Sequence, residues 1–200
     1  MTTGATTENA SKNQLICYRL APEKSTFIVQ SFAEGLFSAF GHDPIIGIRD
    51  FSGEAQFVPN TFENASVTLK INTRALTLSG EVREKDRAEI ERAMREQVLE
   101  VETYPEILFS SANISANRLA EGRYRVRIIG DLTLHGVTQK NIWISAEARL
   151  DDSFLRTQGE FSLKQTDFGI KPFSAVGGTI KLKNELRFTF DIAAEKKDEG

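Results

Sequence analysis

Strict alternation of apolar and polar side chains fills most of the last hundred residues of this chain, in four long runs separated by short turn signals. The run 179–192 shows it most clearly, because its apolar side chains fall on one face: Ile180, Leu182, Leu186, Phe188, Phe190 and Ile192. Successive side chains of a strand point to opposite faces, so this run is predicted to be a half-buried strand. Repeated four times, the pattern predicts a curved antiparallel sheet with an apolar inner face.

The run 123–134 follows the same rule with one exception. Its apolar positions from Tyr124 to Leu134 alternate with charged ones, but Ile129 falls on the polar face. The segment 135–138 (HGVT) then predicts a turn, because Gly supplies the positive φ that a tight hairpin demands. The apolar positions from Ile142 to Leu150 run back, which indicates a hairpin.

Strands are expected at 26–32, 45–51, 54–58, 66–72, 106–114, 123–134, 139–150, 155–166 and 179–192. Eight strands close into a barrel just wide enough for one small ligand. The sequence therefore predicts an all-β fold, an extended eight-stranded antiparallel barrel.

One segment, 83–99, breaks the β pattern. Ile90, Ala93, Met94, Gln97 and Val98 recur in it at helical spacing, with charges elsewhere. This predicts one amphipathic helix between strands, whose narrow apolar stripe covers an end of the barrel. The alternative is that the stripe around Met94 docks a partner protein.

Length and charge limit the class of protein. A chain of 200 residues suits one domain, and its 40% hydrophobic content with 14 Phe is enough for a sizeable core. The net charge of -3 provides no basic field for nucleic acid. No segment approaches the roughly 20 apolar residues of a membrane span.

The two ends of the chain are predicted to lie outside the barrel. We expect a disordered N-terminal tail at 1–16, a barrel domain at 17–193 and a charged C-terminal tail at 194–200. The first sixteen residues hold no apolar stretch of the kind a signal peptide needs, so we expect a cytoplasmic protein. The single Cys17 excludes an intrachain disulfide and fits a reducing compartment.

Only two histidines are present, and both lie in predicted loops. An imidazole next to a carboxylate, as in His42–Asp43, could act as a base or grip a polar head group, or it could simply bond loop backbone. His135 lies in the hairpin turn, where we expect it to bond the backbone. No Ser nucleophile in a Gly-flanked elbow, no Cys/His cluster with metal spacing and no Gly-rich phosphate loop is present, so we expect no enzyme, no metal and no cofactor.

Six short segments, in this order and at these separations, resemble the YceI-like family of lipid-binding barrels: 25–29 (STFIV), 41–43 (GHD), 51–53 (FSG), 104–109 (YPEILF), 130–138 (GDLTLHGVT) and 167–170 (DFGI). The resemblance covers about residues 18–193. It implies a lipocalin-like barrel whose long apolar tunnel takes a polyisoprenoid chain, such as an isoprenoid quinone or a polyprenyl phosphate.

On this basis we expect a protein that carries or sequesters an isoprenoid lipid. The residues expected to contact the ligand are Phe27, Val29, Phe40, His42, Ile46, Phe51, Leu69, Ile71, Phe109, Ile128, Leu132, Phe161, Leu163, Phe168 and Phe188. The alternatives are a lipocalin-like enzyme that acts on an apolar substrate through His42 and Asp43, and an interaction protein whose barrel is filled by its own side chains. A homodimer is also expected, because closed two-fold pairs are the commonest homo-oligomers.

Overall fold

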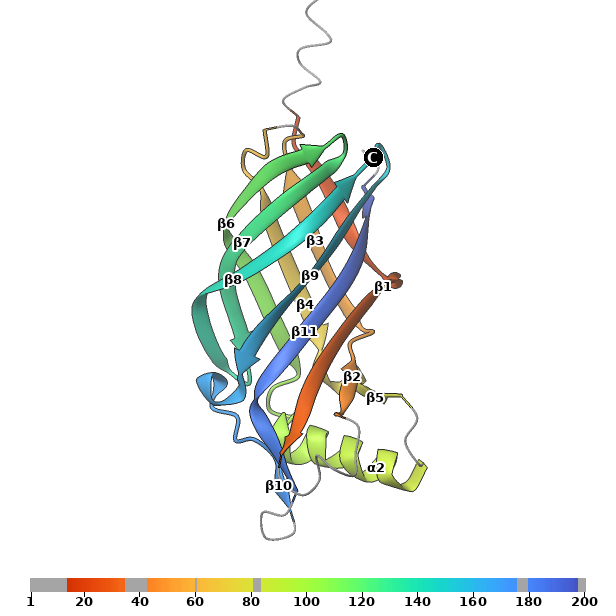
Figure 1. The fold of residues 1–200 in the computed structure, drawn as a ribbon, viewed down its shortest axis with the longest axis vertical. Helices are drawn as coiled ribbons and strands as arrows, with labels where there is room; N and C mark the ends of the chain where they lie inside the picture. Colours follow the sequence, from red (N-terminus) through yellow and green to blue (C-terminus); the bar gives the residue numbers. More distant parts are fainter. Residues whose placement is uncertain (1–13, 35–42, 60, 81–83, 176–179, 198–200) are drawn as a thin grey trace, which may run out of the picture.

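The structure is a computed structural model of the chain, and it describes residues 14–34, 43–59, 61–80, 84–175 and 180–197. Eight of the strands in these residues close into an antiparallel barrel (Figure 1). These strands are β1 (Ile16–Glu34), β3 (Phe51–Phe57), β4 (Ser66–Asn72), β6 (Glu106–Ala120), β7 (Arg123–Leu134), β8 (Val137–Leu150), β9 (Phe154–Lys164) and β11 (Ile180–Lys196). The predicted fold class is confirmed.

The barrel closes between the first and the last of its strands. Neighbours run in the order β11, β9, β8, β7, β6, β4, β3, β1, and β1 pairs back with β11. The first part of β1 pairs with β3, and its second part pairs with the short strand β2 (Ile45–Gly47), which in turn pairs with β5 (Thr77–Ser79). Another short strand, β10 (Ser174–Ala175), pairs with the start of β11.

Several strands are longer than the sequence predicts. The sequence predicts a start at residue 26, but strand β1 begins at Ile16. The prediction is late because the alternation is lost between Ala21 and Thr26, where the ladder with β11 shifts register. Strand β6 continues to Ala120 instead of residue 114, and its last four residues are exposed on both faces, so they show no alternation. The predicted strand 45–51 is divided, and its last residue, Phe51, belongs to β3.

The chain ends differ from the prediction as well. Strand β11 runs to Lys196, and Ala194 is only 1% exposed. The backbone N–H of Lys197 donates to the Cys17 carbonyl at 2.9 Å, and the Lys197 ammonium pairs with Glu54. Residues 194–197 therefore complete the barrel and do not form the expected charged tail. Of the expected N-terminal tail, residues 1–13 lie outside the described residues, and Ile16 already belongs to β1.

The helix is present but packs differently from the prediction. It comprises α2 (Glu84–Ala93) followed by a π-helical turn, η4 (Met94–Val98), and lies at one end of the barrel beside β2 and β5 (Figure 1). Met94 is buried as expected, but Ile90 is 40% exposed. The barrel-facing side of α2 is polar, because Arg87 donates to the Leu78 carbonyl and Glu91 accepts from the Leu78 N–H.

The turn between β7 and β8 agrees with the sequence prediction. The predicted hairpin turn is confirmed as a two-residue turn at His135–Gly136, with φ of 51° and 72°, the combination of a type I′ turn. Among the described residues, no helix has the length and apolar character needed to span a bilayer. We call the end of the barrel that carries α2 the helix end, and the opposite end, where β1 begins and β11 finishes, the distal end.

Candidate functional site: an apolar cavity inside the barrel

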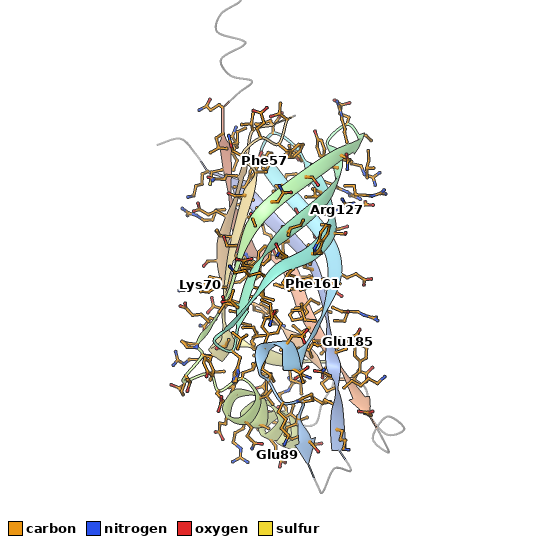
Figure 2. All side chains as sticks on the ribbon, turned by 90° about the vertical axis from the view of Figure 1, so that its left-hand side faces the viewer. Phe57, Lys70, Glu89, Arg127, Phe161 and Glu185 are labelled. Atoms are coloured by element: carbon orange, nitrogen blue, oxygen red, sulfur yellow. The ribbon has the colours of Figure 1, made fainter. Side chains whose placement is uncertain are left out.

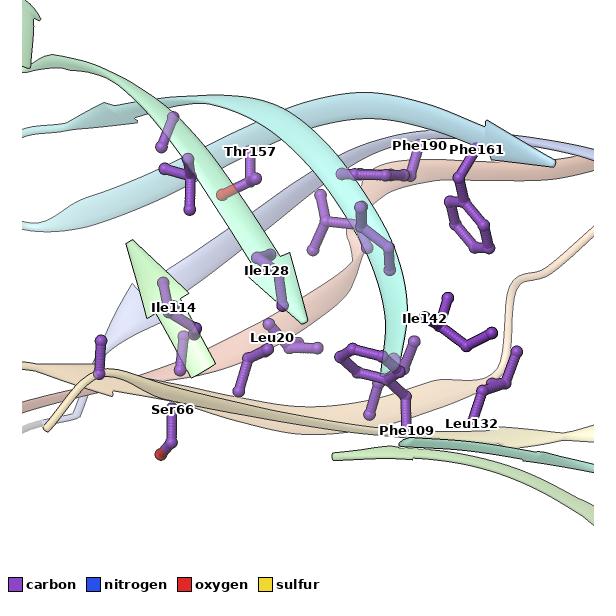
Figure 3. Close-up of a pocket in the computed structure, with 18 of the residues that line it drawn as sticks. Leu20, Ser66, Phe109, Ile114, Ile128, Leu132, Ile142, Thr157, Phe161 and Phe190 are labelled. Carbon is purple, nitrogen blue, oxygen red and sulfur yellow. The ribbon is translucent and has the colours of Figure 1, made fainter. Parts of the chain in front are cut away.

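The barrel encloses a cavity between the inward-facing side chains of its strands. The cavity offers about 170 Å³ to the centre of a water molecule, and all eight barrel strands contribute to its lining. Figure 3 shows Leu20, Phe109, Ile128 and Phe161 facing this space from four different strands. A closed antiparallel sheet with one apolar face produces such a space without any dedicated element.

The lining is almost entirely hydrocarbon. Gln56, Ser66 and Thr157 are its polar members, and none of the described residues that line it carries an ionisable side chain. An apolar cavity of this kind offers a water molecule no polar partners, so it favours an apolar ligand over water. The chemistry available inside is therefore burial of hydrocarbon.

Aromatic rings close the cavity towards the distal end. Phe62, in the loop between β3 and β4, stacks on Phe57 with ring centroids 5.2 Å apart and meets Tyr124 edge-on at 4.7 Å. The ring of Tyr18 also stacks on the ring of Phe57, with centroids 5.5 Å apart. Burial, with a smaller contribution from nearby Asp151, raises the pKa of the Tyr18 hydroxyl, so this ring stays neutral. Figure 2 shows Phe57 near this end of the barrel, and Phe161 closer to its middle.

Packed side chains border the cavity at the helix end, where Leu134 of β7 still lines it. Phe168, in the 3₁₀ turn after β9, is 1% exposed and belongs to a core cluster that also includes Met94, Ile48 and Ile170. Five of the predicted ligand contacts lie outside the cavity lining: Val29, Ile46, Phe51, Leu163 and Phe168. Ile46 is half-buried, and the other four are buried in the core. Alternation predicts which face a residue occupies, but not whether it borders open space. Val29 is paired with the lining residue Phe188, and Phe51 with the lining residue Ile71.

Eight of the predicted contacts line the cavity: Phe27, Leu69, Ile71, Phe109, Ile128, Leu132, Phe161 and Phe188. Two others, Phe40 and His42, lie outside the described residues. That any of these residues contacts a ligand stays a prediction. The lining also includes Val126, Ile144 and Phe190, which the same alternation could have identified. Phe62 gave no such signal, because it lies in a loop.

One position shows how tightly the wall is packed. A Cβ atom added to Gly130 of β7 would lie 2.5 Å from Cζ of Phe109 and 2.6 Å from the Ser110 carbonyl oxygen. Glycine at this position lets the Phe109 ring lie across β7, and this contributes to the shape of the cavity.

The ladder between β4 and β6 is shorter than its strands. Their ladder ends at the pair Thr68–Ser110, although β6 continues to Ala120. Beyond this pair, the Val67 N–H donates to the Ser111 hydroxyl at 2.8 Å. The inward positions Val67 and Ile114 are only half-buried, whereas Val126 on β7 is buried. A second unpaired stretch lies between β8 and β9, whose ladder ends at the pair Ser145–Glu160 although β9 continues to Lys164. These two stretches are the candidates for ligand access among the described parts of the wall.

The two candidate polar residues that the structure describes, His135 and Asp43, are not part of the cavity lining. His135 Nε2 lies 2.9 Å from Glu100 Oε2, and its ring packs on Tyr104 with centroids 4.2 Å apart. His135 thus pairs with a side chain instead of the backbone that we expected. Asp43 Oδ1 accepts the Ala33 N–H at 2.9 Å. Within the described residues, no group of three or more His, Cys, Asp or Glu side chains is placed to hold a metal ion.

Solved structures with this fold are known. The crystal structure of BcnA from Burkholderia cenocepacia is similar with a TM-score of 0.66 at 15% identity, covering 87% of this chain and 98% of that one. A polyisoprenoid binding domain from Saccharophagus degradans, implicated in plant cell wall breakdown, gives 0.64 at 15% identity, with 90% and 98% covered. The YceI protein of Campylobacter jejuni gives 0.58 at 14% identity, with 76% and 85% covered. These identities show the fold alone.

One comparison at the level of sequence finds a match and another does not. No curated protein matches the chain significantly. The family profile described as the YceI-like domain, however, matches residues 18–194, which span β1 to β11 and include every residue of the cavity lining. The chain belongs to the YceI-like family.

Proposed function

We propose that this protein binds a long-chain isoprenoid lipid in the barrel cavity and carries or sequesters it. The observation that supports this most is the continuous hydrocarbon lining, to which all eight strands contribute. Each CH₂ group transferred from water to such a surface contributes about 0.8 kcal/mol, so a long tail binds without strong polar contacts. The Saccharophagus degradans structure with the same fold, described as a polyisoprenoid binding domain, agrees with this class of ligand.

An isoprenoid quinone and a polyprenyl phosphate are the two ligands that we favour. The tail of either fits a lining of branched aliphatic and aromatic side chains, which matches a methyl-branched chain. The polar head finds no charged partner in the described lining and is therefore expected outside it, near the half-buried Val67 and Ile114 between β4 and β6.

Binding without turnover is the function that the geometry favours. Acid–base catalysis requires an ionisable group within reach of the substrate. The described lining contains none, and Asp43, one half of the pair considered for catalysis, bonds the backbone of Ala33 outside the cavity. The enzyme alternative predicts product formation from an isoprenoid substrate, and this product would be lost in a His42→Ala variant.

Two neighbouring isoleucines on β7 provide a matched test. Ile128 lines the cavity, and Ile129 points outside, so Ile128→Trp fills the cavity while Ile129→Trp adds the same indole to the outer surface. Delipidated protein is titrated with a polyprenyl quinone while its melting temperature is followed. A ligand that binds only the native state raises this temperature. We expect the rise in the wild type and in Ile129→Trp, and a much smaller one in Ile128→Trp.

Equal rises in the two variants would place the quinone outside the cavity. No rise in the wild type, with either the quinone or a polyprenyl phosphate, would remove the basis for a lipid carrier.

A further inference from the structure

The outer wall of the barrel carries a row of arginines on β7 and β8. Arg123, Arg125 and Arg127 alternate along β7 with the inward residues, and all three are exposed. Arg149 of β8 lies directly opposite Arg123. The alternation of the strand places these guanidinium groups on one surface.

An exposed tryptophan extends the same surface. Trp143 of β8 is the only tryptophan of the chain and is 61% exposed. The Arg127 guanidinium carbon lies 5.8 Å from its ring centroid, a cation–π contact. Ile129, the apolar residue that broke the alternation of β7, is directly opposite Trp143. These two side chains form an apolar pair on the outside of the barrel, next to the arginines.

The charge of this surface is opposite to that of the whole molecule. The chain has a net charge of -3, yet this face carries four arginines, with Glu147 as their acidic neighbour on β8. Glu147 pairs with Arg123 at 3.4 Å. Arg149 is attracted to Asp191 of β11. Arg125 and Arg127 have no ion-pair partner among the described residues, so their positive charge is available to a partner.

We propose that this basic face, defined by Arg123, Arg125, Arg127, Trp143 and Arg149, docks the protein on the surface of an anionic lipid bilayer. Arginines near such a surface are attracted to its anionic head groups, and tryptophan prefers the boundary between head groups and hydrocarbon. The face is the outer wall of a sheet, which suits a broad surface better than a small molecule. Figure 2 shows Arg127 on the outside of the barrel.

Docking in this orientation would serve the proposed lipid cargo. The unpaired stretch between β8 and β9 borders the basic face, and strand β6 separates this face from the unpaired stretch between β4 and β6. A bilayer bound at β7 and β8 therefore lies beside both candidate access routes. This step rests on the proposed function. The docking itself rests only on the charges and on Trp143.

The single tryptophan makes the docking directly measurable. Its emission is recorded while vesicles of phosphatidylcholine and phosphatidylglycerol are added to the purified protein, with pure phosphatidylcholine vesicles as the comparison. We expect a saturable blue shift with the anionic vesicles, which high salt reverses because it screens exposed charges. Cargo inside the cavity leaves Trp143 in water, so cargo loading alone does not produce this shift.

Co-sedimentation with the same vesicles tests the arginines. Arg125→Gln combined with Arg127→Gln should weaken binding about thirtyfold, the equivalent of about 1 kcal/mol for each arginine. The control combines Arg49→Gln with Arg92→Gln, two exposed arginines near the helix end, and removes the same charge. We expect the control to bind as the wild type does.

Equal loss in both double variants, or no difference between the two kinds of vesicle, would overturn the proposal. A blue shift with RNA but none with vesicles would also overturn it and assign the face to nucleic acid. If the Arg125→Gln/Arg127→Gln variant no longer binds vesicles but its organic extract still contains lipid, docking has failed while cargo binding has not.

Discussion

Two phenylalanine rings in the middle of the barrel show what the cavity requires of a single residue. Phe161 and Phe188 lie on paired strands, and their rings stack with centroids 4.8 Å apart at an angle of 8°. Both line the cavity, so each ring has packed neighbours on one side and free space on the other. Phe168 differs, because it is 1% exposed and does not line the cavity.

This contrast gives a prediction about Phe188→Ala and Phe168→Ala. Truncating a packed phenylalanine costs about 3–5 kcal/mol, the sum of lost burial and the cavity left behind. We expect a loss of this size for both variants without lipid, and a smaller one for Phe188→Ala when lipid fills the new space. Chemical denaturation with and without a polyprenyl quinone measures it. If the quinone rescues Phe168→Ala as well, or rescues neither, Phe188 does not contact the ligand.

The ion pair between Arg156 and Asp191 predicts a pH dependence. Arg156 Nε donates to one carboxylate oxygen at 2.6 Å and its terminal nitrogen to the other at 2.9 Å, and this hydrogen bonding holds the pKa of Asp191 below its ordinary value. A carboxyl whose folded pKa is lowered stabilises the fold above its unfolded pKa of about 3.9 and loses this contribution as the pH falls through the folded value.

We therefore expect the wild type to lose more stability between pH 7 and pH 3 than Asp191→Asn does. Denaturation curves at both pH values measure the difference. Asp152→Asn is the control, since Asp152 is exposed and has no hydrogen-bond partner among the described residues. If the pH dependence of Asp191→Asn equals that of the wild type, the pair does not contribute.

At this scale, sequence alternation predicted the inward face well and the cavity only in part. It placed Phe109, Leu132 and Phe188 correctly on the inner face. It could not separate them from Leu163, because inward residues that border the cavity and inward residues packed in the core share the same alternation. Which of them borders open space depends on the side chains that face it from the other strands, which no single strand encodes.

At the scale of elements, the hairpin between β7 and β8 depends on Gly136. Its φ of 72° is left-handed, and an added Cβ would lie 2.7 Å from a carbon of the Tyr104 ring. Gly80 has a φ of 91° but has open space around its Cα. The Gly136→Ala variant therefore has both backbone strain and a clash with Tyr104. The Gly80→Ala variant has backbone strain alone.

We expect Gly80→Ala to cost about 1–2 kcal/mol, the usual penalty of a left-handed residue with a Cβ, and Gly136→Ala to cost clearly more. Urea denaturation gives both values. Equal costs would show that Tyr104 moves aside freely and does not fix the turn.

Elements with regular alternation were predicted to within a few residues, and those without it were not. Strands β4 and β7 have the predicted bounds. Strand β1 was shortened in the prediction because Pro22 and the charged residues after it interrupt the pattern at the register shift. The end of β11 was taken for a tail because Glu195 and Lys196 are charged, although Glu195 pairs with Lys24 on the outside of the barrel.

At the scale of the whole molecule, the homodimer stays a prediction. Two-fold pairs need a self-complementary surface, and we assign the wall that carries Trp143 to a bilayer instead. Light scattering of the concentrated protein decides the state. A mass of twice 22.3 kDa supports the dimer, and a mass near 22.3 kDa excludes it.

A lipid tail inside the cavity is the central claim, and mass spectrometry of an organic extract of the purified protein tests it most directly. Ile128→Trp, purified in parallel, shows whether extracted lipid comes from the cavity. We expect a long-chain isoprenoid in near-stoichiometric amount from the wild type and little from the variant. An extract without lipid from folded wild-type protein, or the same lipid in equal amount from both proteins, would contradict this claim.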